Sequence, residues 1–267
     1  MKAKFILCFL AISFILLVLL LPLAAIFMEA FSKGLETFWL ALVDPDALAA
    51  LRLTLITAFF AVSFNLLFGL SAAWCISKYE FRGKSLLLSL IDLPLAISPV
   101  VVGMIFILLY GKHGAFGGLI QTLNFNIIFA VPGIILVTTF ISSPLIIREL
   151  LPLMQEQGNE EEEAALTLGA SGLQTFISIT LPKIKWALLY GVILCNARAM
   201  GEFGAVSVVS GHIRGETNTL PLHVEVLYNE YEYVASFAVS ALLACLAIVT
   251  LVVKSVLEST LKGEKAN

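Results

Sequence analysis

The chain has 267 residues, a formal net charge of −3, 60% hydrophobic residues and only 13% charged residues. Soluble domains carry about 45–50% apolar and roughly 25% charged residues, so this composition excludes a water-soluble globular protein. Its continuous apolar runs reach or approach the ~20 residues of a membrane-spanning helix. They predict an all-α, polytopic membrane bundle, because a helix satisfies its own backbone hydrogen bonds in lipid. Runs that do not alternate exclude a transmembrane β-barrel.

Six stretches are predicted to span the membrane as helices. In chain order they are Phe5–Met28, Leu51–Ile76, Ser85–Tyr110, Ile127–Ile147, Trp186–Ser210 and Ala235–Leu257. The first follows a basic start, and its 24 residues exceed the roughly 7–15 of a signal-peptide core. We therefore expect it to be retained as a membrane helix.

The distribution of Lys and Arg predicts the orientation. With the N-terminus inside, 11 of the 16 basic residues lie on the cytosolic side, and the outer side holds only Lys33, Arg52, Lys112 and Arg214. Because basic loops stay in the cytosol, we expect a multi-pass plasma (inner) membrane protein with both termini cytoplasmic. We divide it into an N-terminal helix with an outer segment (1–50), a main membrane domain (51–257) and a cytosolic tail (258–267).

The longest loop, residues 148–185, is predicted to be cytosolic and largely helical. Asn159 followed by four glutamates, Glu160–Glu163, is typical of a helix start, since Asn caps free N–H groups and carboxylates are stabilised there. Gly169 permits a left-handed turn that ends this helix. A second short helix, Leu173–Ile179, is expected to end before Pro182.

Two short helices bent about a glycine form a compact knob that can enter a cleft on a cytosolic protein. The alternative is an amphipathic helix that lies on the membrane surface. The four glutamates disfavour that alternative, because the inner leaflet is itself negatively charged.

The same loop carries a spaced motif: Glu-Ala-Ala, three residues, Gly, nine residues and Ile-x-Leu-Pro. It resembles the EAA loop of ABC-importer permeases of the type I class. The resemblance implies a type I transmembrane domain whose loop docks in a groove of a separate ATPase and passes its ATP-driven closure to the membrane helices. The residues thereby assigned to ATPase coupling are Glu163, Ala164, Ala165, Gly169, Ile179, Leu181 and Pro182.

Three other stretches narrow the resemblance. Arg198–Ala205 is similar to the R-x-x-G-E-F-G-A stretch of oxyanion permeases, and Leu93–Gly103 is similar to both their sulfate and molybdate groups. Ser210–Leu222, with its His-Ile-Arg-Gly sequence, resembles the sulfate/thiosulfate group. This resemblance implies a sulfate/thiosulfate permease that pairs with a second related permease, two ATPase subunits and a soluble sulfate-binding protein in the lipid bilayer. It implies no cofactor on this chain, with ATP and Mg²⁺ held by the ATPase.

Polar residues inside the predicted spans are candidates for the transport path. Arg198 and Glu202 lie near the middle of the fifth span, where each charge costs roughly 2.5–3.5 kcal/mol, and their i, i+4 spacing lets them pair. The pair either fixes helix register or forms part of a gate. Asp92 either satisfies backbone groups freed by Pro94 or lines the path. Asn65 is predicted to form hydrogen bonds between helices.

The sequence shows no catalytic or metal site. Gly83-Lys84-Ser85 resembles the end of a phosphate-binding loop, but Lys78 stands where the required earlier glycine would be. The chain is therefore not expected to be an enzyme. His113, His212 and His223 have no metal-ligand spacing, and no basic patch indicates nucleic acid.

Two alternatives remain. One is a molybdate or tungstate permease of the same class. The other is a secondary transporter or channel that needs no ATPase, which broken helices and membrane carboxylates suit but which leaves the EAA spacing unexplained.

Overall fold

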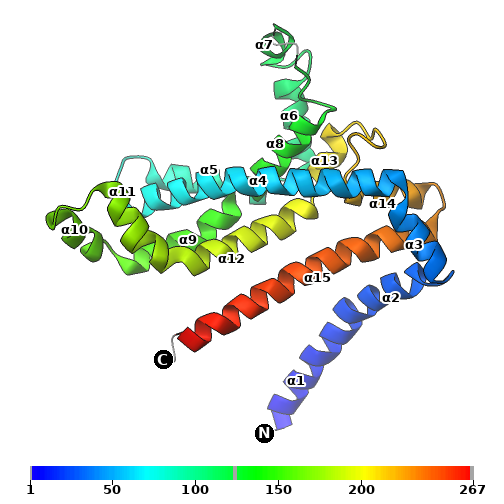
Figure 1. The fold of residues 1–267 in the computed structure, drawn as a ribbon, viewed down its shortest axis with the longest axis horizontal. Coiled ribbons are helices and arrows are strands. Elements are labelled where there is room, and N and C mark those ends of the chain that lie inside the picture. Colours follow the sequence, from blue (N-terminus) through cyan, green and yellow to red (C-terminus); the bar gives the residue numbers. More distant parts are fainter. Residues whose placement is uncertain (1, 123–124, 265–267) are drawn as a thin grey trace.

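The computed structural model describes residues 2–122 and 125–264, and every regular element in those ranges is a helix (Figure 1). The N-terminal rod consists of α1 (Lys2–Phe14), the π-helical η1 (Ile15–Leu20) and α2 (Leu21–Ala30), and α3 (Leu35–Val43) follows it. The remaining elements are α4 (Pro45–Lys78), α5 (Lys84–Ala96), α6 (Pro99–Tyr110), α7 (Gly117–Thr122), α8 (Val131–Ser142), α9 (Pro144–Gln157), α10 (Glu160–Thr167), α11 (Gly172–Thr175), the π-helical η2 (Phe176–Thr180), α12 (Leu181–Met200), α13 (Gly204–Val209), α14 (Leu220–Asn229) and α15 (Tyr233–Glu264).

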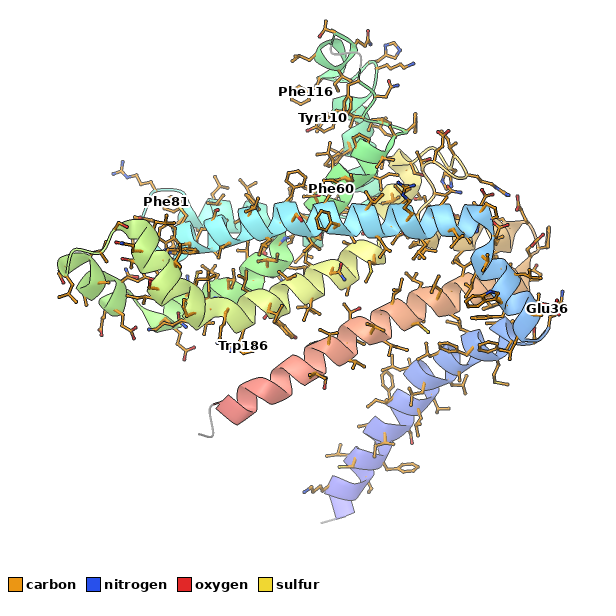
Figure 2. All side chains as sticks on the ribbon, in the orientation of Figure 1. Glu36, Phe60, Phe81, Tyr110, Phe116 and Trp186 are labelled. Carbon is orange, nitrogen blue, oxygen red and sulfur yellow. The ribbon has the colours of Figure 1, made fainter. Side chains whose placement is uncertain are left out.

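Within the described residues, five helical stretches are long and apolar enough to cross a membrane, and α5 with α6 makes a sixth if the bent pair is one span. The predicted all-α, polytopic membrane fold is therefore confirmed. Figure 2 shows apolar side chains projecting all along the N-terminal rod, which meets the rest of the protein where α2 packs on α15. Such surfaces suit lipid as their surroundings rather than water.

The third predicted span is not one continuous helix. Ser85–Tyr110 is divided into α5 and α6, and the helix axis bends by 109° between them. Ile97 and Ser98 have extended ψ values of 142° and 133°. For Ser98 the reason is that a residue before proline avoids the helical conformation, and Pro99 begins the next helix. At the far end of α6, the rings of Tyr110 and Phe116 stack with centroids 5.6 Å apart (Figure 2).

The fifth predicted span is also broken, because α12 ends at Met200 and Gly201–Phe203 separates it from α13. At its other end the prediction of a helix stop before Pro182 is wrong. The chain runs from α11 through η2 into α12 without leaving helix. The Leu181 N–H bonds to the Phe176 carbonyl in a widened π turn, and such a turn accommodates a proline that would strain a regular helix.

Two helices continue past the ends of their predicted spans. Residues 148–157, expected in the cytosolic loop, continue the fourth span as part of α9. Residues 258–264 of the expected tail continue α15, while residues 265–267 lie outside the described part of the chain.

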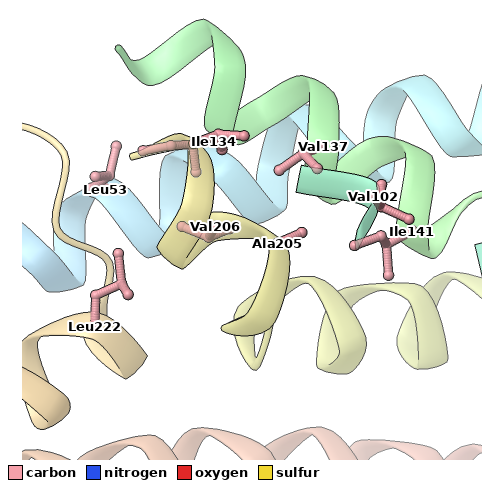
Figure 3. Close-up of a cluster of buried hydrophobic side chains, with 9 residues drawn as sticks. Leu53, Val102, Ile134, Val137, Ile141, Ala205, Val206 and Leu222 are labelled. Carbon is pink, nitrogen blue, oxygen red and sulfur yellow. The ribbon is translucent and has the colours of Figure 1, made fainter. Parts of the chain in front are cut away.

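Four apolar clusters of the described residues include side chains of α4, and two of them are the largest. One joins α4 to α6, α8, α13 and α14 and includes Leu53, Val102, Ile134, Val206 and Leu222 (Figure 3). The other joins α4 to α5, α9 and α12 and includes Ile76, Ile91, Ile146, Leu150 and Ile184. In membranes close helix packing depends on small residues, and a Cβ on Gly69 of α4 would lie 3.0 Å from the Ile146 side chain.

Gly103 is the closest such approach between α6 and α13. A Cβ there would lie 2.8 Å from Val208 Cβ and 2.9 Å from the Ala205 carbonyl oxygen. Since backbone cannot move aside cheaply, we expect Gly103→Ala to destabilise the protein by about 1–3 kcal/mol. Its melting temperature in detergent should fall, whereas Gly118→Ala, where nothing lies within 4 Å of the new Cβ, should leave it unchanged. Equal melting temperatures for the two variants would contradict this packing.

Candidate functional site

The predicted knob is present at one end of the molecule, and we define it as residues 160–180, from α10 to η2 (Figure 1). Its helix starts where predicted, with Asn159 at the N-cap position. The Asn159 side chain makes no capping hydrogen bond, so that detail was wrong. Its ψ of −6° is helical, whereas a side-chain cap needs the extended region.

Gly169 ends α10 in the predicted manner, with a φ of +91°. The Ala170 N–H bonds to the Ala165 carbonyl and the Gly169 N–H to the Leu166 carbonyl, each at 3.0 Å. These are the two bonds of a Schellman motif. Ser171 then starts α11 with a reciprocal capping box with Gln174, so the bend is specified on both sides of the glycine.

The knob exposes several large apolar side chains, and we call the surface that they form its outer face. The largest side chains on it are exposed to the extent of 89% for Leu168, 70% for Leu173 and about half for Leu166 and Ile177. Among the seven motif residues, Glu163, Ala164, Gly169 and Pro182 are exposed and Ala165, Ile179 and Leu181 are half-buried. Leu166 and Leu168 lie between two candidate spans, whereas Leu173 and Ile177 lie at the start of the helical stretch Gly172–Met200. An exposed apolar surface of this kind is typical of a protein-binding site.

The inward face of the knob is held by charges that sequence reasoning missed. Glu162 pairs with Lys78 at 3.0 Å, and Glu161 pairs with Lys183. The available signal was the position of Lys78 at the end of a span, since a basic residue there suits both the helix dipole and a nearby acidic turn.

Arg198 and Glu202 do pair, but not within one helix. Arg198 lies in the last turn of α12, and Glu202 lies in the break after it. Their atoms Nη1 and Oε2 are 2.7 Å apart, an ion pair without hydrogen-bond alignment. Glu202 Oε1 accepts a hydrogen bond of 3.0 Å from the Ala205 N–H at the start of α13.

These contacts give Glu202 a definite role in the break. Its side chain is only 2% exposed, and one carboxylate forms an ion pair with the guanidinium before the break and accepts a hydrogen bond from an N–H after it. Whether the pair fixes helix register stays a prediction. A place on the transport path for Arg198 and Glu202 stays a prediction.

Asp92 contacts a side chain, not the backbone groups freed by Pro94 that one of its two predicted roles requires. Its Oδ1 accepts a hydrogen bond of 2.8 Å from Arg148 Nε, which links α5 to α9 rather than satisfying the backbone near Pro94. Both side chains are about half-exposed. Asp92 therefore faces an accessible surface of the bundle, and its role in the path stays a prediction.

Asn65 joins three helices, as predicted. Its Nδ2 donates to the Thr139 carbonyl at 3.1 Å and to Ser142 Oγ at 2.8 Å, both on α8, and reaches Cys195 Sγ on α12 at 3.5 Å. Neutral hydrogen bonds of this kind fix helix register in lipid.

The histidines are not gathered together. His223 lies in α14 rather than in a loop, and its burial lowers its pKa from the ordinary value while the nearby Asp46 and Asp44 carboxylates oppose that shift. Among the described residues no group of three His, Cys, Asp or Glu side chains is placed to hold a metal ion.

Residues 65–262, about three quarters of the chain, match the family described as the binding-protein-dependent transport system inner membrane component. The chain belongs to this family. This permease is 52% identical over 248 residues to the sulfate transport system permease protein CysW of Escherichia coli strain K12, a match that covers 93% of this chain and 85% of that protein. It is 35% identical over 249 residues to the sulfate transport system permease protein CysT of Salmonella typhimurium strain LT2, covering 93% and 90%.

The fold of this permease is similar to that of a solved bacterial ABC transporter involved in the import of the acidic polysaccharide alginate. The TM-score is 0.78 at 16% identity, over 97% of this chain and 94% of that chain. The predicted ABC-importer transmembrane fold is thus confirmed. The family places this permease in the inner membrane as a multi-pass component, with the ATPase a separate component.

The Glu202 contacts generate a stability prediction. Glu202→Gln keeps an oxygen for the Ala205 N–H but removes the charge opposite Arg198, so we expect a loss of about 1–3 kcal/mol of stability and a lower melting temperature in detergent. The matched control is Glu230→Gln, which removes an ion pair with Arg214 in which both side chains are nearly half-exposed. Exposed pairs contribute only about 0–1 kcal/mol, so equal shifts for the two variants would refute the assigned role.

Proposed function

We propose that this permease is one of two membrane subunits of an ATP-driven sulfate importer and forms half of its translocation path. The two relatives, at 52% and 35% identity, are both named sulfate transport system permeases. The stretches Arg198–Ala205 and Ser210–Leu222 carry the corresponding resemblance within this chain. Thiosulfate, with a similar charge and shape, is the expected second substrate.

The observation that carries the coupling part of the proposal is the two-faced knob. Charges hold its inner face to the bundle, while Leu168 and Leu173 stand free on its outer face. Burying such side chains against a partner is favourable by roughly 25 cal/mol per Å² of apolar area. The ATPase groove is the proposed partner, and ATP and Mg²⁺ belong to that subunit. Glu163, Ala164, Ala165, Gly169, Ile179, Leu181 and Pro182 are the proposed coupling residues.

Two permeases and two ATPase subunits complete the proposed assembly, together with a soluble sulfate-binding protein. The similarity to both CysW and CysT, at different identities, supports a partner permease that is related to this chain but distinct from it. In Figure 1 the N-terminal rod and α15 both run from the end formed by α3 and α14 toward the side of the knob. This arrangement supports a cytosolic location for both termini.

Of the two alternatives, a molybdate or tungstate permease shares the same architecture and differs only in the anion. A secondary transporter has no support, because the family consists of components of binding-protein-dependent systems.

Gly169→Val should abolish recruitment of the ATPase while membrane insertion stays intact. A β-branched residue at a φ of +91° costs about 1–3 kcal/mol, and relaxing that strain straightens the bend of the knob. Co-purification of the ATPase with the permease measures the effect.

The matched control for this variant is Gly34→Val. Gly34 has nearly the same φ, +90°, and open space around it, but it lies before α3 and outside the knob. ATPase retained by the Gly169 variant, or lost equally from both variants, would count against the knob as the docking element.

The choice of anion is tested by uptake. Cells that lack their own sulfate importer, supplied with this permease and its partner subunits, should grow on limiting sulfate and take up labelled sulfate. Excess thiosulfate should compete for uptake and molybdate should not. Rescue of molybdate uptake alone would favour the alternative substrate.

A further inference from the structure

The carboxylate of Glu162 connects three separate parts of the chain. Its Oε2 lies 3.0 Å from Nζ of Lys78, the last residue of α4. Its Oε1 accepts a hydrogen bond of 2.6 Å from the hydroxyl of Thr180, the last residue of η2. Glu162 itself lies in the first turn of α10. One side chain therefore joins α10 to the last residue of α4 and to Thr180, at which α12 begins.

Lys78 extends this connection to a fourth element. Its Nζ also donates to the Gly158 carbonyl at 2.6 Å, and Gly158 is the residue at which α9 ends. The ammonium group thus fixes the junction between α9 and α10 as well as the Glu162 carboxylate. It also lies at the C-terminus of α4, where the helix dipole favours a cation.

The connection is shielded from water. The Lys78 side chain is 8% exposed and that of Glu162 is 16% exposed, and Thr180 is buried. Aromatic packing supports it, because the rings of Trp74 on α4 and Phe176 in η2 meet edge to face at 5.6 Å. Shielded charges that lose their partner are costly to leave unpaired, so the knob cannot separate from α4 without a penalty.

Neighbouring glutamates on α10 divide two tasks between them. Glu163, in the EAA motif, is exposed, whereas Glu162 contacts Lys78 of the bundle. Successive helical residues point in directions about 100° apart, so a single turn presents one carboxylate to a partner and one to Lys78.

We propose that Glu162 is a positioning residue, which transmits displacement of α10 to the end of α4 through Lys78 and to the start of α12 through Thr180. The inference rests on the proposed function, because it assumes that an ATPase moves the knob. It adds that transmission runs through a polar connection that can be removed without touching the docking face. Docking and coupling are therefore separable by mutation.

The test compares Glu162→Gln with the unmodified permease in the complete transporter, reconstituted in liposomes with its partner permease, ATPase and binding protein. Glutamine keeps the length of the side chain and an oxygen for Thr180 but loses the charge opposite Lys78. We expect the ATPase to co-purify normally and to hydrolyse ATP. We expect the number of sulfate ions imported per ATP hydrolysed to fall about fivefold or more, the lower end of typical coupling between sites.

Four further variants, including Lys78→Met alone, make the result specific. Lys78→Arg keeps the cation, so its sulfate-to-ATP ratio should stay close to that of the unmodified permease. The double variant Lys78→Met with Glu162→Gln should lose no more than the worse single variant, since both remove one interaction. Glu156→Gln removes an exposed carboxylate from α9, outside the knob, and should leave the ratio unchanged.

Two results would overturn the inference. One is an unchanged sulfate-to-ATP ratio in Glu162→Gln. The other is loss of ATPase binding in that variant, which would make Glu162 part of the docking face instead. If Glu162→Gln does not fold, the same two measurements are made on Thr180→Val, which removes only the hydroxyl contact. An unchanged sulfate-to-ATP ratio or a loss of ATPase binding in that variant would likewise overturn the inference. Failure of the proposed function would look different, because the unmodified permease would then not retain the ATPase at all.

Discussion

The constraint on which this structure depends is that a bilayer offers no water to a broken helix. Every backbone N–H or carbonyl freed within the membrane region needs a partner in the protein, and this chain breaks two of its predicted spans. At the break after α12, Glu202 supplies the partner by accepting from the Ala205 N–H while it pairs with Arg198. The charges that look most like transport residues in the sequence are thus also what permits the break.

The knob differs from these breaks, because its bend lies between two candidate spans, Val131–Gln157 and Gly172–Met200. Its helix ends, the Schellman bend at Gly169 and the Ser171 capping box, are satisfied locally. It therefore needs the bundle only for its position. Ion pairs and hydrogen bonds on its inner face provide that position, and the apolar outer face stays free for a partner.

Sequence reasoning was strongest where a pattern has one physical solution. Long apolar runs specify membrane helices, glycine at position 169 specifies a positive φ, and Asn65 in a span specifies an interhelical hydrogen bond. It failed where the outcome depends on distant partners. The contact of Asp92 with Arg148 joins residues 56 positions apart. Pro182 is accommodated by a π turn, which the local amino-acid propensities do not predict.

A single helix connects the two ends of the molecule. α4 contains 34 residues, about 51 Å of helix at ~1.5 Å per residue, and its only proline, at its first position, cannot kink its interior. At its last residue Lys78 holds the knob. Near its start the Thr54 hydroxyl accepts a hydrogen bond of 2.8 Å from the Leu220 N–H of α14. Because α4 also packs on α8, α9 and α12, a shift imposed at Lys78 must either move α4 as a rod or disrupt the apolar clusters along it. Close-packed interiors resist the second outcome, so rigid-body movement of α4 is the mechanically cheaper response.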